Sequence, residues 1–247
     1  MPANTLPSGI HDLFSLADRI HAGLRIHGPW LRIDLARILA EMLRAARATE
    51  CDWAAAHARK AAARRRFAAA DAALAAWLAK ARLTVMLALG SAWSEQWLEA
   101  GFAHRQTNVP KRLAHRMALA HRLTVFFARH REYDVPFAKV NAAVALAVYT
   151  EIVSAELETR AARADANRCK QARDVAEKSL RRQMHCVVTM LSLALQPGDL
   201  RWLDFGLNQP NPDAPADERR RTRVLGAEVI RMPHAAEMRE VASSVAM

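Results

Sequence analysis

Two long stretches of the chain, residues 31–89 and 137–196, carry apolar side chains at helical spacing and contain no Gly or Pro. In the first, the apolar positions are Leu35, Ile38, Leu39, Met42 and Leu43, and then Leu74, Trp77, Leu78, Val85 and Met86. In the second, they are Val144, Val148 and Ile152, and then Leu180, Met184, Val187, Val188 and Leu191. Steps of three and four residues place side chains on one face of an α-helix. The pattern predicts long helices over roughly 31–90 and 137–195.

A short motif, Trp-Leu-acid-x-Gly-apolar, follows each long stretch. It reads WLEAGF at 97–102 and WLDFGL at 202–207, so the two copies are offset by 105 residues. A fixed internal offset is the mark of a repeated structural segment.

A second similarity lies upstream of the long stretches. PSGIHDLFSLADRIHAGLRIH, from Pro7, aligns with PKRLAHRMALAHRLTVFFARH, from Pro110, at an offset of 103 residues. In this register Arg19 corresponds to Arg122, Leu24 to Phe127 and His27 to His130. The chain is therefore predicted to be a tandem duplication, with one repeat over 7–102 and the other over 110–207.

Each repeat predicts a short helix, a turn, a long helix and the motif. We expect short helices over about 8–27 and 110–131, each begun by its proline, which suits the first helical turn. In the motif, Gly101 and Gly206 are expected to take a positive φ where the chain turns. Trp97 and Trp202 should bury their rings at the helix end. The acid is expected to cap a turn or to pair with a nearby arginine.

The expected fold class is an all-α, elongated, antiparallel helical bundle over residues 1–207. A helix of almost 60 residues would be about 90 Å long and needs a partner helix over its apolar face. A parallel pair would require the short intervening segment to span that whole length, so we expect antiparallel helices related by a pseudo-twofold axis. Residues 208–247 are expected to be a Pro-rich linker and a tail with little fixed structure.

Composition and charge leave the choice of partner open. The chain has 247 residues, a formal charge of +11 and a pI of about 10.5, which permits a nucleic acid or an anionic surface as partner. Arg and Ala are both favoured by a GC-rich genome, so the charge alone does not decide. The three cysteines show no CxxC spacing and indicate reduced thiols in a cytoplasmic protein. We expect no signal peptide and no membrane insertion, because the apolar runs are shorter than the roughly 20 residues of a span.

Tests for catalytic chemistry give no site. No Glu precedes a His by three residues, and HExxH, GxxxxGK[ST], GxGxxG and GxSxG do not occur. His185 and Cys186 are adjacent, so on a helix they point about 100° apart and make a poor catalytic pair. The sequence predicts no catalytic residues, no metal and no cofactor.

A basic cluster in the first long helix is the candidate for contacts with phosphate. It consists of Arg59, Lys60, Arg64, Arg65 and Arg66, and the tail adds Arg219, Arg220 and Arg221. The cluster surrounds the helix rather than forming one stripe. The competing interpretation is therefore that some of these arginines pair with Glu156, Glu158 or Asp165 across the helix pair.

The stretch RWLDFGLNQP at 201–210 resembles an RWxxFGLNxP pattern found in bacterial helical proteins of uncharacterised function. In that family the pattern ends a duplicated helical region and leads into a fibronectin type III-like module. The resemblance covers at most residues 1–215, and the remaining chain is too short for such a β-sandwich. The resemblance implies a helical fold and no particular activity.

The sequence thus favours a non-enzymatic structural or protein-interaction module that self-associates or docks a protein partner. The alternative is a basic nucleic-acid-associated protein that contacts the phosphate backbone without sequence specificity. An enzyme with an unrecognised site is the third alternative.

Overall fold

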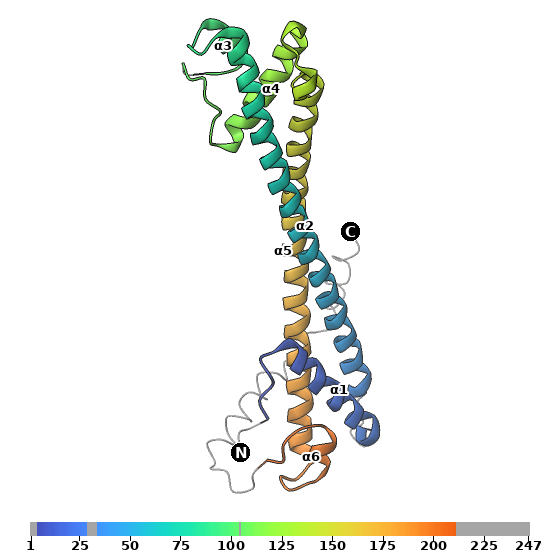
Figure 1. Cartoon of the computed structure of the whole chain (residues 1–247). Helices are drawn as coiled ribbons and strands as arrows, with labels where there is room; N and C mark the ends of the chain where they lie inside the picture. The colour runs from blue at the N-terminus through green and yellow to red at the C-terminus, as the bar shows by residue number, and fades with distance from the viewer. Residues whose placement is uncertain (1–3, 29–33, 104, 211–247) are drawn as a thin grey trace, which may run out of the picture. The chain divides into compact units, whose positions relative to one another are not determined.

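The computed structural model describes residues 4–28, 34–103 and 105–210, and 79% of these residues are helical. In this part of the chain the only extended pairing is an isolated bridge between Val135 and Val140. The protein is therefore all-α, as the sequence predicts. The helices are α1 (Ile10–His27), α2 (Leu35–Leu89), α3 (Glu95–Glu99), α4 (Leu113–Arg129), α5 (Ala142–Ala194) and α6 (Arg201–Asp204), with 3₁₀ turns η2 (Arg131–Tyr133) and η3 (Pro136–Ala138) (Figure 1).

The two short helices begin later than expected. Pro7 and Pro110 each lie three residues before the first helical residue, Ile10 in α1 and Leu113 in α4. A two-residue bend separates each proline from its helix, so the prediction that proline occupies the first helical turn is wrong. The same local arrangement nevertheless occurs at both positions.

The chain forms two compact units, and each unit draws on both long helices. Of the described residues, unit 1 comprises 4–28, 34–53 and 169–210, and unit 2 comprises 54–103 and 105–168. Each unit therefore joins the short helix and the start of the long helix from one predicted repeat to the end of the long helix and the motif from the other. The expected tail lies outside the described residues from position 211 onward.

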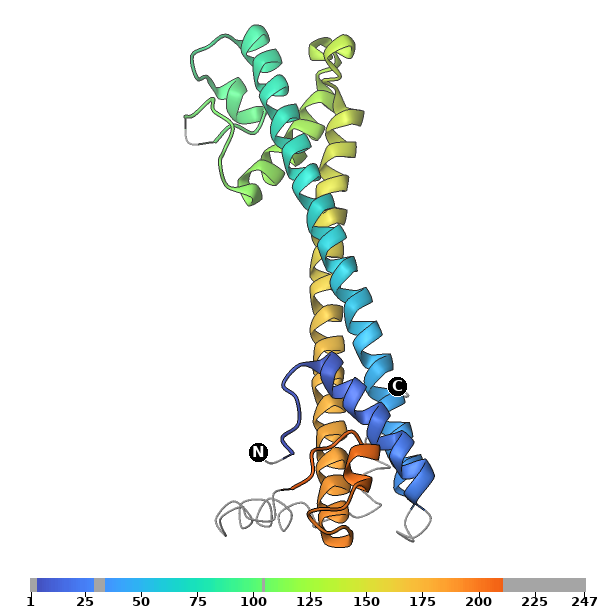
Figure 2. The same ribbon diagram turned by 60° about the horizontal axis from the view of Figure 1, so that its bottom comes forward.

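The core of unit 1 is mainly aliphatic. One face of α1 packs against the start of α2, the end of α5 and the segment around α6, where Trp202 and Phe205 are buried (Figure 2). The other fully buried large side chains of this core are Leu13, Ile20, Leu24, Leu39, Leu180, Met184, Val187 and Leu191. Burying one such side chain contributes about 1.5–3 kcal/mol, so this cluster accounts for the position of α1.

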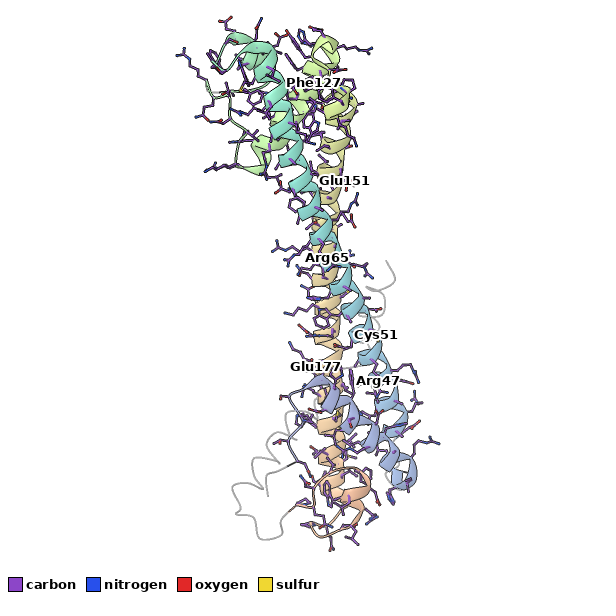
Figure 3. All side chains as sticks on the ribbon, viewed as in Figure 1. Arg47, Cys51, Arg65, Phe127, Glu151 and Glu177 are labelled. Atoms are coloured by element: carbon purple, nitrogen blue, oxygen red, sulfur yellow. The ribbon has the colours of Figure 1, made fainter. Side chains whose placement is uncertain are left out.

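The core of unit 2 is richer in aromatic side chains. Trp77 of α2 and Phe127 of α4 meet edge-to-face with ring centroids 6.5 Å apart, and Phe126 lies beside Phe127 at 5.6 Å. Trp97 and Phe102 form a second edge-to-face pair at 4.9 Å. Figure 3 shows Phe127 among the side chains gathered around α4. Such pairs stabilise the core beyond the effect of the apolar area that they bury, because ring edges and ring faces carry opposite partial charges.

Small residues line the contact between α2 and α5 within unit 2. Ala56, Ala63 and Ala70 recur every seven residues on α2 and are buried. The Thr159 hydroxyl donates to the Ala63 carbonyl at 3.2 Å, so a side chain of α5 reaches the backbone of α2. Alanine allows this close approach because its side chain is a single methyl group.

Candidate functional site

The repeated motif forms a helix-ending turn in unit 2, which we call the Trp–Gly turn of residues 97–102. The N–H of Phe102 donates to the Trp97 carbonyl at 2.9 Å, and the N–H of Gly101 donates to the Leu98 carbonyl at 2.9 Å. Gly101 has a φ of 100°. This pair of bonds around a positive-φ residue is a Schellman ending. The indole of Trp97 is buried and donates to the Gly90 carbonyl at 3.2 Å.

Unit 1 has the same Trp–Gly turn at residues 202–207. The N–H of Leu207 donates to the Trp202 carbonyl at 3.1 Å, and the N–H of Gly206 donates to the Leu203 carbonyl at 2.9 Å. Gly206 has a φ of 67°. The buried indole of Trp202 donates to the Gln196 carbonyl at 3.0 Å. The predicted positive φ at both glycines and the predicted burial of both tryptophans are confirmed.

Each turn glycine lies against an arginine of the unit's short helix. A Cβ on Gly101 would come within 2.7 Å of the Arg122 Cβ, and a Cβ on Gly206 within 2.9 Å of the Arg19 Cβ. Arg19 and Arg122 are the residues that the repeat register aligns. Glycine is therefore needed at each of these positions for two reasons: the positive φ of its backbone, and the close approach of the neighbouring helix.

The acid of each turn pairs with a histidine, not with the arginine or turn cap that the sequence suggested. In unit 1 the Nε2 of His27 lies 2.8 Å from Asp204. In unit 2 the Nε2 of His130 lies 3.2 Å from Glu99. We call these contacts the His–acid clasps, since each joins the end of a short helix to its Trp–Gly turn. The signal was present in the sequence, because the repeat register already aligned His27 with His130.

The two clasps differ in what surrounds the histidine. The Nδ1 of His130 lies 3.0 Å from Glu132, and its ring lies 4.8 Å from Phe126 and 5.8 Å from Tyr133. Hydrogen bonds to Glu99 and Glu132 raise the pKa of His130 above its usual range, and the bond to Glu99 has the larger effect. Two hydrogen bonds lower the pKa of Glu132: the larger effect comes from the bond to its own backbone, and the smaller from the bond to His130. In unit 1 the ring beside His27 is Phe205, at 5.9 Å.

The candidate phosphate-contacting arginines are partly occupied by carboxylates. Arg59 lies 2.8 Å from Asp165. Arg66 lies 2.9 Å from Glu151 and also pairs with Glu158. Arg66 donates hydrogen bonds to both glutamates, and these bonds raise its pKa, with the larger effect from Glu151. The predicted pairing with Asp165 and Glu158 is confirmed, whereas Glu151 was not foreseen.

The other members of the basic cluster differ in exposure. Lys60 is half-buried, Arg64 is exposed, and Arg65, labelled in Figure 3, is also exposed. Of the three acids named as alternatives, Glu156 instead binds Arg160 on its own helix at 2.5 Å. The tail candidates Arg219, Arg220 and Arg221 lie outside the described residues.

The surroundings of Cys186 do not activate its thiol. Cys51 is an exposed free thiol, and Cys169 and Cys186 are half-buried free thiols. Burial raises the pKa of Cys186, and burial together with Arg181 lowers the pKa of His185. Both shifts favour the neutral forms and oppose a thiolate–imidazolium pair. Among the described residues, no three His, Cys, Asp or Glu side chains are grouped as metal ligands would be.

One described helix has the length and composition of a membrane span. It is α2, which contains a sufficiently apolar 18-residue window, 28% of it buried. A single helix of this kind is weak support for a span, since core helices and signal sequences meet the same test. The expectation that the chain does not insert into a membrane remains a prediction.

No protein-family model matches the chain, and comparison with curated proteins and with solved structures found no significant match. The functional argument therefore depends on the chain's own contacts.

Proposed function

We propose that this chain is a non-enzymatic protein-interaction module built from two copies of one helical segment. Support for the duplication comes from side-chain contacts that recur in the repeat register. The His–acid clasp, the indole bond, the Schellman ending and the glycine–arginine approach each occur once per unit, at corresponding positions. Similar helices alone would not reproduce four different contacts in the same order along the chain, at offsets of 103 to 106 residues.

The ion pairs between α2 and α5 support an antiparallel pairing of these helices. In unit 2, Arg59 pairs with Asp165, and Arg66, about two helical turns further along α2, pairs with Glu158 and Glu151. As the residue number rises on α2, the number of its partner on α5 falls. That is the order in which antiparallel helices meet.

Exposed leucines at corresponding positions in the two units carry the functional proposal. Leu87 and Leu193 are 84% and 69% exposed, and Leu98 and Leu203 are 50% and 59% exposed. Leu87 and Leu193 are offset by 106 residues, as are the buried pair Val85 and Leu191. Leu98 and Leu203 follow the two turn tryptophans directly.

A single exposed leucine is common and needs no explanation. Conservation of leucine at two corresponding exposed positions is different, because nearby exposed positions have diverged. Leu200, for example, is 73% exposed and corresponds to Glu95. Leucines that do not contribute to either core, yet recur in both units, favour contact with another protein, for which a second copy of the chain is the simplest occupant.

Sedimentation velocity over a range of concentrations tests this proposal. We expect the wild-type chain to associate, and the double variant Leu87→Gln/Leu193→Gln to associate less. Leu200→Gln is the matched control, since it removes an equally exposed leucine that has no counterpart, and it should behave as wild type.

A monomeric wild-type chain at every concentration contradicts self-association. A control variant that weakens association as much as the double variant contradicts the assignment of the contact to the recurring leucines. The nucleic-acid alternative is supported by the exposure of Arg64 and Arg65, and predicts binding that weakens steeply with salt.

A further inference from the structure

The histidine of unit 2 has an acceptor on each ring nitrogen. Its Nε2 faces Glu99 at 3.2 Å, and its Nδ1 faces Glu132 at 3.0 Å. A neutral imidazole carries one N–H and one lone pair, whereas an imidazolium carries two N–H donors. Only protonated His130 can donate to both carboxylates. A neutral His130 with its proton on Nε2 still donates to Glu99, but its Nδ1 lone pair then faces the Glu132 carboxylate, and this repulsion disfavours the arrangement.

The histidine of unit 1 does not have this requirement. Its Nε2 faces Asp204 at 2.8 Å, its ring packs beside Phe205, and Asp199 interacts with it electrostatically, whereas the hydrogen bond is made to Asp204. The neutral tautomer with the proton on Nε2 can donate to Asp204 without taking up a second proton. The same clasp can therefore form in unit 1 whether or not the histidine is charged.

We propose that the His130 clasp is a proton-controlled latch that holds the Trp–Gly turn of unit 2 on α4, while the corresponding His27 clasp of unit 1 holds over the same pH range. Glu99 approaches the latch from α3, and Glu132 and Tyr133 from η2. Phe126 packs on it from α4. Arg129 and Arg131 flank His130 in sequence, and their positive charge does not offset the two carboxylates, which dominate its environment.

The sign of the pH dependence follows from the direction of the pKa change. The pKa of His130 is raised in the folded chain above its ordinary value of 6.5. Its contribution to stability is therefore complete below about pH 6.5, while the glutamates remain ionised, and is lost as pH rises through the folded pKa. Each pH unit by which the folded pKa exceeds the unfolded value contributes a tenfold change in the opening equilibrium.

NMR of the full-length chain tests the latch, with the histidine ring signals followed between about pH 5 and about pH 8.5. We expect His130 to titrate above its ordinary pKa. We also expect hydrogen-exchange protection factors of residues 97–102 to fall as His130 loses its proton, while those of residues 202–207 stay level. Protection factors corrected for the intrinsic exchange rate are required, because exchange itself depends on pH.

Glu132→Gln separates a latch from a merely structural contact, since Glu132 is exposed and its replacement keeps the side-chain size. The variant should remain folded, lower the pKa of His130 and reduce the pH dependence of protection over residues 97–102. His27→Gln is the control and should leave that dependence intact. Titration of wild-type His130 at or below its ordinary pKa, or equal pH responses of the two turns, would overturn the proposal.

Discussion

Units 1 and 2 hold the same turn with the same contacts but fill the space beside it from opposite sides. In unit 1, α1 contributes Gly23, and a Cβ there would come within 2.6 Å of the Phe205 ring. The corresponding residues of unit 2 are Phe126 on α4 and Ala100 in the turn, both buried. For this pair of positions, unit 1 has its phenyl ring on the turn, and unit 2 has it on the short helix.

This exchange shows what the shared architecture constrains. Contacts with directional requirements are repeated almost unchanged: the indole bond, the positive-φ glycine and the histidine paired with an acid. By contrast, the pair of positions held by Gly23 and Phe205 only fills volume and differs between the units, since a core tolerates different side chains when the total volume is kept. The comparison therefore separates directional contacts from packing.

Loss of the turn tryptophan should have the largest effect. Trp97→Ala and Trp202→Ala each remove a fully buried ring and its indole hydrogen bond, and each should cost about 3–5 kcal/mol of unfolding free energy. Denaturant titration measures the total cost, and hydrogen exchange locates it. We expect protection to fall mainly in the unit that carries the substitution. Equal loss in both units would show that they unfold as one cooperative body.

Converting the aromatic position of unit 1 to that of unit 2 tests the exchange directly. Gly23→Phe should clash with the Phe205 ring and with the backbone carbonyl oxygen of Asp204, which lies 2.9 Å from an added Cβ, and should cost about 1–3 kcal/mol or more by overpacking. Phe205→Ala should leave a cavity. The double variant Gly23→Phe/Phe205→Ala should be more stable than the two single costs predict, with a coupling of about 1–3 kcal/mol in denaturant titration. Additive costs would refute the correspondence.

The turn glycines should differ in sensitivity. Both lie against an arginine side chain, but the φ of 100° at Gly101 is further from the left-handed basin of L-residues than the 67° at Gly206. Gly206→Ala should cost about 1–2 kcal/mol, and Gly101→Ala more. Thermal or denaturant unfolding checks the order. Gly198→Ala is the control, because a Cβ there meets nothing within 4 Å, and it should be neutral.

Surface arginines of unit 2 should have the smallest effect on stability. Arg66→Gln breaks the pairs with Glu151 and Glu158 and should lower the melting temperature slightly, because exposed ion pairs contribute little. Arg64→Gln/Arg65→Gln should leave the melting temperature unchanged. If the chain binds nucleic acid through them, the salt dependence of DNA affinity should fall by a slope of about 2 in the double variant. An unchanged slope removes these two arginines from any phosphate contact.

Local pattern was sufficient for the elements of the fold. Helical spacing and the lack of Gly and Pro predicted α2 and α5 to within a few residues, because both signals act within one or two turns of helix. The repeated motif predicted that Gly101 and Gly206 would have a positive φ. The starts of α1 and α4 were missed, since proline is compatible both with a first turn and with the bend before it.

What the sequence determined by itself is therefore the all-α class, the two long helices and the two glycine turns, all of which depend on backbone preference or spacing. Only the tertiary structure decided the partners: that Glu99 and Asp204 bind histidines, that Arg66 binds Glu151 and Glu158, and that each unit joins parts of both long helices. These choices depend on which side chains meet across more than 80 residues of sequence for Arg66 and more than 170 for His27. Periodicity within one helix does not contain that information, because it specifies a face and not the neighbour that covers it.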